Sequence, residues 1–168
     1  MKGKEGTAMP DMLVKLYRLP SAAPAVERAS ASGVEIRRAQ PYEREAVYQF
    51  VLNQFSQTWA DEAMVAFTHQ PVTAYIALDG KRIVGFAAYE CTRRDYFGPT
   101  GVQEAYRGRG IGEALLILSL QGLYEMGYAY AIIGGVGPAD FYSMVVGAEL
   151  IEDSVPGIYT PAAEMTVE

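Results

Sequence analysis

A glycine-rich turn between an apolar strand and an apolar helix constrains the fold of this chain more than any other feature. Residues 102–116 read VQEAYRGRGIGEALL. Glycine has no Cβ, so the backbone N–H groups of such a turn can converge on an oxyanion. The N-terminus of the following helix adds unpaired N–H donors and a partial positive charge, and Arg107 and Arg109 supply full charges. The turn therefore predicts a binding site for a pyrophosphate group.

The spacing within the turn excludes two common phosphate-binding loops. The loop of nucleoside triphosphatases requires Gly-Lys-Ser or Gly-Lys-Thr, and neither tripeptide occurs in the chain. A dinucleotide fingerprint counted from Gly108 places Glu113 where the third glycine is required. The pattern that remains is Arg107-x-x-Gly110-x-Gly112 at the start of an apolar helix.

This pattern resembles the coenzyme A pyrophosphate loop of the GNAT superfamily of acyl-CoA-dependent N-acyltransferases. The alternative is a tight strand-to-helix turn with two surface arginines. The resemblance implies acetyl-CoA as the co-substrate, with the strand before the turn offering backbone groups to it. The residues that it implies in cofactor binding are Gly101, Val102, Arg107, Gly108, Arg109, Gly110, Ile111 and Gly112.

Length and composition indicate a globular protein without a metal centre. A chain of 168 residues, half of them hydrophobic, can bury about two-thirds of its unfolded surface. No apolar run approaches the roughly 18 residues of a membrane-spanning helix, and no signal peptide is expected, so no membrane partner is predicted. The single cysteine, Cys91, excludes an internal disulfide and predicts a reducing, cytoplasmic location. With only one histidine, His69, no clustered metal site is expected.

The net charge of −6 bears on the partners of the protein. A nucleic-acid-binding protein ordinarily presents a basic face, so no nucleic acid is expected as a partner. The acidic balance has two interpretations, which are simple solubility and the electrostatic attraction of a cationic amine.

Hydrophobic patterning predicts an alternating order of strands and helices. Asp79-Gly80 is a strong signal for a two-residue hairpin turn. The expected elements are a strand over 13–19, a helix over 21–33, a strand over 34–39, helices over 41–55 and 58–67, strands over 71–78, 82–91 and 97–103, a helix over 110–126, a strand over 128–133, a helix over 138–146, and a final hairpin of 149–151 and 159 onward.

This order over residues 34–160 also resembles the GNAT fold. The resemblance implies an α/β (α+β) fold with a mixed, mostly antiparallel central sheet and helices on both faces. Splayed strands over 98–103 and 128–133 would form the coenzyme A cleft. Residues 1–33 are expected to form an N-terminal extension with a short strand and helix, and residues 34–168 the acyltransferase domain.

The strand over 13–19 lies outside the family-like region. It is expected either to add an edge strand or to pair with a second subunit, which would give a homodimer. Residues 1–11 are polar and are expected to be disordered.

A second stretch, ADFYSMVVGA over 139–148, resembles the GNAT segment in which a short helix carries Phe-Tyr. The resemblance implies that Tyr142 protonates the departing CoA thiolate, and a phenol suits this step because its pKa of about 10 lies near that of an alkyl thiol. The alternative is a core tyrosine whose hydroxyl caps a backbone group. The chain departs from many relatives in two places, since glycines at 134, 135 and 137 replace an asparagine and Ala148 replaces an aromatic residue.

A proton acceptor is required because alkyl amines, with a pKa of about 10, are mostly protonated at neutral pH. Relatives often place a carboxylate near the end of the 82–91 strand, which indicates Glu90 as the general base. Asp95 and Glu62 are the alternatives. Trp59 is a candidate for stacking on the acceptor, and His69 is expected to be a loop residue. The segment 153–157 either covers the acceptor site or forms a simple turn.

Together these features predict an acetyl-CoA-dependent N-acetyltransferase. It would transfer an acetyl group to a primary amine, on a small molecule or a peptide, by direct attack without a covalent enzyme intermediate. One alternative is a non-catalytic acyl-CoA-binding sensor or interaction protein with the same fold. Another is a nucleotide- or S-adenosylmethionine-dependent enzyme that uses residues 134–137, which is disfavoured because Asp140 stands where a third glycine is required.

Overall fold

One seven-stranded sheet with the strand order β2-β3-β4-β5-β6-β1-β7 organises the protein. The computed structural model describes residues 9–164. All neighbouring strands are antiparallel except β5 and β6, which are parallel. The strands are β1 Met12–Lys15, β2 Val34–Arg38, β3 Ala74–Asp79, β4 Arg82–Tyr89, β5 Tyr96–Val102, β6 Tyr130–Ile133 and β7 Glu149–Leu150. The predicted mixed, mostly antiparallel sheet is confirmed.

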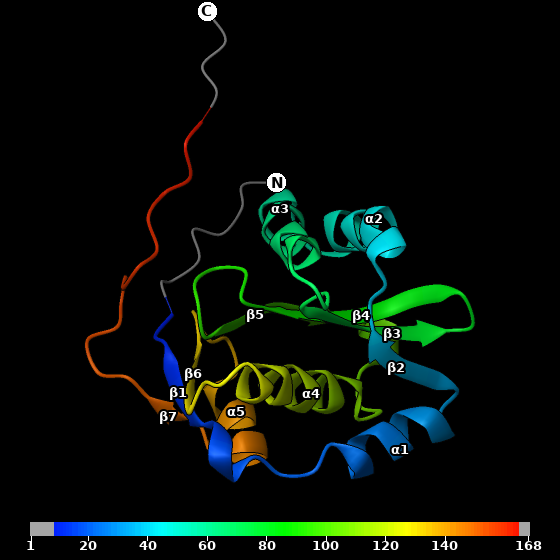
Figure 1. The fold of residues 1–168 in the computed structure, drawn as a ribbon, viewed down its shortest axis with the longest axis horizontal. Coiled ribbons are helices and arrows are strands. Elements are labelled where there is room, and N and C mark those ends of the chain that lie inside the picture. Colours follow the sequence, from blue (N-terminus) through cyan, green and yellow to red (C-terminus); the bar gives the residue numbers. More distant parts are fainter. Residues whose placement is uncertain (1–8, 165–168) are drawn as a thin grey trace, which may run out of the picture.

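Helices cover both faces of the sheet, as expected. In Figure 1, α2 and α3 lie above the sheet, and α1, α4 and α5 lie below it. Each layer of helices encloses its own hydrophobic cluster against the sheet. The helices are α1 Ala23–Ala31, α2 Arg44–Gln54, α3 Gln57–Ala63, α4 Ile111–Glu125 and α5 Ala139–Val146, and short 3-10 turns lie at Leu16–Arg18, Pro41–Glu43, Met64–Thr68 and Glu104–Tyr106.

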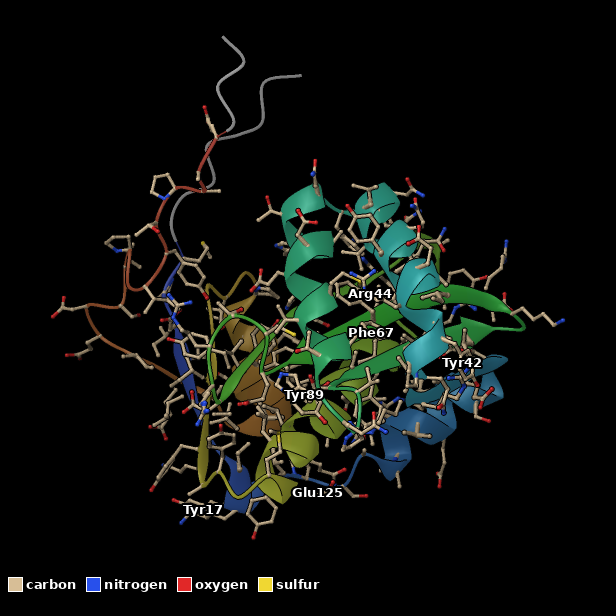
Figure 2. All side chains as sticks on the ribbon, turned by 45° about the horizontal axis from the view of Figure 1, so that its top comes forward. Tyr17, Tyr42, Arg44, Phe67, Tyr89 and Glu125 are labelled. Atoms are coloured by element: carbon tan, nitrogen blue, oxygen red, sulfur yellow. The ribbon has the colours of Figure 1, made fainter. Side chains whose placement is uncertain are left out.

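Helix α4 is apolar along most of its length because it is buried on several sides. It packs against β3, β4 and β5 on one side and against α1 on another. The ring of Tyr89, at the end of β4, occupies the space that a Cβ at Gly122 would need. Figure 2 shows Tyr89 inside the molecule, whereas Glu125 at the end of α4 and Tyr42 before α2 lie on the outside.

Strands β5 and β6 separate soon after they meet. They pair only through Tyr96 with Ile132 and Phe97 with Ile133. On its other side, β5 remains paired with β4 as far as Val102. Within the described residues, the edge of β5 from 98 to 102 that faces β6 therefore has no strand partner. This is the splay that the sequence analysis expected.

The N-terminal strand is not an edge strand. β1 lies between β6 and β7, with Met12 opposite both Ile133 and Leu150. Met12 and Val14 are fully buried. The expected edge position is wrong, because β1 lies between β6 and β7. The expected pairing with a second subunit stays a prediction. The strand is also shorter than expected, since Leu16–Arg18 forms a 3-10 turn.

The predicted final hairpin is also wrong. Its first arm is reduced to the two residues of β7, which pair with β1. Residues 151–164 contain no strand. The residues after β7 instead turn back toward the N-terminal segment and the loop after β6, where Ser154 accepts the N–H of Asp11 and Tyr159 packs against Gly134. Disorder was also predicted for residues 1–11. Residues 1–8 lie outside the described residues, whereas Asp11 is buried and ordered by its contacts.

Candidate active site

A cavity of about 640 Å³ opens beside β5, between the N-terminus of α4 and helix α5. We call it the main cavity. It contains every residue that the sequence analysis assigned to cofactor binding except Arg109, and it also contains Tyr142. Its lining residues are Arg28, Phe97, Thr100, Gly101, Val102, Tyr106, Arg107, Gly108, Gly110, Ile111, Gly112, Glu113, Leu116, Pro138, Phe141 and Tyr142.

Glycine occupies the positions of this turn for two different physical reasons. Gly108 and Gly110 have φ angles of +80° and +81°, a left-handed conformation that favours glycine. Gly110 caps α4, whose first-turn N–H groups have no acceptor within the helix. Gly112 is different, because a Cβ there would meet only Val102 Cγ2, at 3.8 Å. Nothing in the protein's own packing requires glycine at 112, so its missing side chain leaves room in the main cavity.

The two arginines of the turn diverge. Arg107 lines the main cavity, and its Nε donates to the carbonyl oxygen of Val102 at 3.4 Å. The guanidinium of Arg109 instead stacks 4.7 Å from the ring centroid of Tyr106 and donates to the carbonyl oxygen of Ala105 at 3.3 Å. Arg109 is not among the described residues that line the cavity.

Helix α1 contributes a residue that the sequence analysis missed. Arg28 lines the main cavity and forms an ion pair with Glu113, in the first turn of α4. Its side chain also lies close to Gly110. No local pattern signals this contact, because it joins residues 85 positions apart in the chain.

Tyr142 projects from α5 into the wall of the main cavity. It is 8% exposed, and its ring packs edge-on against Phe97 and Phe141, with centroid distances of 6.5 and 5.2 Å. Its hydroxyl forms no hydrogen bond with another described residue, so it does not cap a backbone group. Burial raises the pKa of Tyr142. The phenol is therefore protonated at neutral pH and free to donate.

Two smaller cavities continue from the main one. A middle cavity of about 270 Å³ shares Phe97, Thr100, Pro138 and Tyr142 with it. An outer cavity of about 280 Å³ shares Trp59, Gly98 and Gly134, among others, with the middle one. The three cavities form one row along the splayed strands. The outer cavity is lined by Met9, Trp59, Glu62, Thr92, Phe97, Gly98, Pro99, Gly134, Gly135, Pro156 and Tyr159.

Glu62 supplies the carboxylate of the outer cavity. It projects from α3, one turn after Trp59, and accepts a hydrogen bond from the hydroxyl of Thr92. It is the only acidic residue in the described lining. Trp59, the candidate for stacking on an acceptor, lines both the outer and the middle cavity.

Glu90 lies elsewhere. It is 9% exposed, has a φ of 60°, and its Oε1 accepts the backbone N–H of Asp95 at 2.5 Å. It is not among the described residues that line the three cavities. Burial, and then the charge of Glu90, raise the pKa of Asp95. His69 follows a 3-10 turn, and its Nε2 lies 3.3 Å from the carbonyl oxygen of Glu90. These contacts hold together the loop that follows β4.

Segments near both ends of the described chain line the outer cavity, and Asp11 joins the two segments. Its carboxylate accepts the backbone N–H of Gly135 at 2.8 Å, and its own N–H donates to Ser154 Oγ at 2.9 Å. The side chain of Tyr159 occupies the space that a Cβ at Gly134 would need. Gly134 is thus required by packing against Tyr159. Of the segment 153–157, Pro156 lines the outer cavity, and the segment also forms a turn in which the N–H of Tyr159 donates to the carbonyl oxygen of Pro156.

Within residues 9–164, no three histidine, cysteine, aspartate or glutamate side chains are grouped to hold a metal ion. None of the helices in this part of the chain combines the length and the apolar character needed to cross a bilayer.

The sequence of this site matches a known family. Residues 44–143 match the acetyltransferase (GNAT) family. The match covers more than half of the chain and includes β5, the glycine turn, α4 and Tyr142. The chain therefore belongs to the GNAT acetyltransferase family. A comparison with curated proteins found no match.

Solved structures confirm the fold. A GCN5-related glucosamine N-acetyltransferase region of a fungal multi-domain GH3 β-N-acetylglucosaminidase superimposes with a TM-score of 0.69 at 16% identity, over 88% of this chain. A GCN5-related N-acetyltransferase from Sphaerobacter thermophilus gives 0.66 at 23% identity over 86%. This chain spans only 20% and 50% of those two proteins. A GNAT family acetyltransferase from Brucella melitensis, solved in complex with acetyl-CoA, gives 0.53 at 17% identity over 80% of this chain and 96% of its own.

Proposed function

We propose that this protein is an acetyl-CoA-dependent N-acetyltransferase that transfers an acetyl group to a primary amine by direct attack. The row of three cavities is the observation that carries this proposal. It leads from an anion-binding turn, past a protonated and unpartnered phenol, to a pocket with one carboxylate. Such a row provides one place for each of the two substrates and a proton donor between them.

Acetyl-CoA would occupy the main cavity. The pyrophosphate would lie at residues 108–112, where backbone N–H groups and the α4 N-terminus face it and Arg107 adds charge. The space left by the missing side chain of Gly112 fits this close approach. The pantetheine arm would follow the unpaired edge of β5 and form hydrogen bonds with its backbone, as an added strand does.

The acetyl transfer needs an oxyanion donor and a proton for the leaving group. A backbone N–H on the open edge of β5 would stabilise the oxyanion formed when the amine attacks the thioester carbonyl. The carbon–sulfur bond then breaks, and Tyr142 would give its proton to the CoA thiolate. Burial raises the pKa of the Cys91 thiol to about 12, and Cys91 lies outside the described lining of the row, which favours direct attack over a cysteine intermediate.

We propose Glu62 as the carboxylate that takes up the proton of the ammonium group. The sequence analysis favoured Glu90, with Glu62 as an alternative. The carboxylate of Glu90 is bound to the backbone of Asp95, whereas Glu62 lines the outer cavity. Geometry therefore supports Glu62, because a general base must reach its proton directly or through one water.

The acetyl acceptor would be a small molecule and not a nucleic acid. An outer cavity of about 280 Å³ is too small for a folded partner. A reducing, cytoplasmic location agrees with the unpaired Cys91.

A non-catalytic acyl-CoA sensor with the same fold remains the competing function. The experiment that separates the two measures binding and turnover on one preparation. Calorimetric titration with acetyl-CoA reports binding, and spectrophotometric detection of the free CoA thiol reports transfer to a panel of amines. We expect both binding and amine-dependent thiol release. Tight acetyl-CoA binding without release in the presence of any amine would favour the sensor.

A further inference from the structure

We infer that the acetyl acceptor is a compact amine with one ammonium group and an aromatic or other apolar body, bound in the outer cavity with its nitrogen at Glu62. The inference rests on the proposed function, since it names the substrate class of the same site.

The size of the outer cavity limits the acceptor. Its volume of about 280 Å³ is at the lower limit of ligand pockets, which are typically about 300–1,000 Å³. Met9 of the N-terminal segment and Pro156 and Tyr159 of the C-terminal segment line two sides of the pocket. A peptide chain would have to pass between these segments, so a compact molecule fits better.

The walls of the outer cavity are mostly apolar and aromatic. Trp59 is 38% exposed beside the cavity, although Phe55 packs on it with a centroid distance of 5.5 Å. Tyr159 and Phe97 add two more rings to the lining. Aromatic rings pack favourably against an aromatic or apolar body, and their faces also attract a cation.

A single negative charge faces these walls. No lysine or arginine of the described residues forms an ion pair with Glu62. Its described hydrogen bond comes from a neutral donor, Thr92, so its charge is not neutralised by the protein. A partly buried carboxylate without a counter-charge is unfavourable, and one ammonium group would satisfy it. A second or third ammonium group would find no further carboxylate in the described lining.

The other charged groups near the pocket do not supply a counter-charge to Glu62. The carboxylate of Asp11 is occupied by the backbone N–H of Gly135. Burial, and then the charge of Asp11, raise the pKa of Tyr159, so its hydroxyl stays neutral. The charge of Arg93 lowers the pKa of Tyr159, but Arg93 is exposed and does not line the cavity.

The outer cavity is also connected to the reacting groups. Trp59 and Gly134 line both the outer and the middle cavity, and the middle cavity reaches Tyr142. A nitrogen that loses its proton at Glu62 can therefore approach a thioester beside Tyr142 while its apolar body stays among the rings.

Trp59 is the only tryptophan in the chain, so its fluorescence reports the occupancy of this pocket without catalysis. The experiment titrates the full chain, with and without CoA, with three probes. The first is 2-phenylethylamine. The second, 2-phenylethanol, has the same aromatic group but no positive charge, and the third, spermidine, has several positive charges but no aromatic group. We expect 2-phenylethylamine to change the emission saturably and to bind at least ten times more tightly than either other probe.

The variant Glu62→Gln tests the charge. It should weaken 2-phenylethylamine binding at least tenfold and leave CoA affinity within twofold, which also shows that the variant is folded. Glu35→Gln, at the opposite edge of the sheet on β2, is the matched control and should change neither value.

The outcomes separate the inference from the proposed function. Tighter binding of spermidine, undiminished binding to Glu62→Gln, or no emission change with any probe in the presence of CoA would overturn the inference. Acetylation of spermidine or of a peptide amine alone would overturn it while leaving the proposed function intact. Binding of 2-phenylethylamine without acetyl transfer to any amine would overturn the proposed function and keep the selectivity of the pocket.

Discussion

The carboxylate of Asp11 accepts the backbone N–H of Gly135 at 2.8 Å and so fixes the loop between β6 and α5 to the N-terminal segment. Asp11 is 5% exposed, and its main chain also bonds to Ser154 and Ile151. One residue thus holds three segments that meet at the outer cavity.

This relationship predicts the effect of Asp11→Ala. The variant removes a hydrogen bond between the N–H of Gly135 and a buried carboxylate, so the free energy of unfolding should fall by about 1.5–3 kcal/mol, as for hydrogen bonds to charged groups. The KM for the amine should rise while CoA affinity stays close to that of the wild type. Urea unfolding and steady-state kinetics measure the two effects. Glu27→Ala, an exposed carboxylate on α1, should change neither.

Gly112→Ala isolates the role of the glycine turn. The helical backbone accepts alanine, and only Val102 would lie near the new Cβ, so stability should be unchanged or slightly higher. The methyl group would project into the main cavity and should weaken CoA binding at least tenfold. Gly122→Ala, in the same helix, should show the reverse pattern. It would overlap Tyr89 and lose about 1–3 kcal/mol of stability while a folded fraction keeps its CoA affinity. Calorimetry and thermal unfolding of both variants check the contrast.

The two arginines of the turn should differ in their effect on CoA binding. Arg107→Ala removes a charge from the main cavity and should cost about 1.5–3 kcal/mol of binding free energy, as hydrogen bonds to charged groups do. Arg109→Ala removes a residue that stacks on Tyr106 and should change the affinity less than twofold. Calorimetric titration at low and high salt measures both, and the loss with Arg107→Ala should shrink as salt screens the charge. Equal losses for the two variants would contradict the assignment.

Tyr142→Phe tests the proton donor. The ring packing against Phe97 is retained, but the hydroxyl is lost, so kcat should fall by about 10²–10⁴-fold with CoA affinity nearly unchanged. The phenol donates only while it is protonated. Because burial raises the pKa of Tyr142, wild-type activity should decline only above about pH 10, and the variant should lack this decline. Tyr124→Phe, an exposed tyrosine at the far end of α4, is the control. Wild-type turnover with an identical pH profile in Tyr142→Phe would place the donor elsewhere.

Features encoded within a few neighbouring residues were predictable from the sequence. The glycine turn, the apolar helix behind it and the hairpin at Asp79-Gly80 all depend on local conformation and spacing. The splay of β5 and β6 followed from the family resemblance, which depends on the same local motifs.

Features that depend on contacts between distant residues were not predictable. Glycine is required at 134 because the side chain of Tyr159 occupies the space that a Cβ would need. At Gly101 the same space is filled by Phe55, from the helical layer on the opposite face of the sheet. The ion pair of Arg28 with Glu113 has no sequence signal. The choice between Glu62 and Glu90 depends on loop geometry after β4, where Glu90 turns to the backbone of Asp95. The hairpin expected at the C-terminus is absent because the residues after β7 turn back to contact Asp11 and Gly134, which are distant in the sequence.

The place of β1 within the sheet also sets an order of assembly. Met12 precedes its strand partners, Ile133 and Leu150, by 121 and 138 residues in the sequence. During synthesis β1 must wait, with its apolar side chains uncovered, until the residues of β6 and β7 have been made. The insertion of β1 between β6 and β7 is therefore a late event, and so is the completion of the outer cavity by Met9 and Asp11. A nascent or truncated chain would have the glycine turn before it has a complete acceptor pocket.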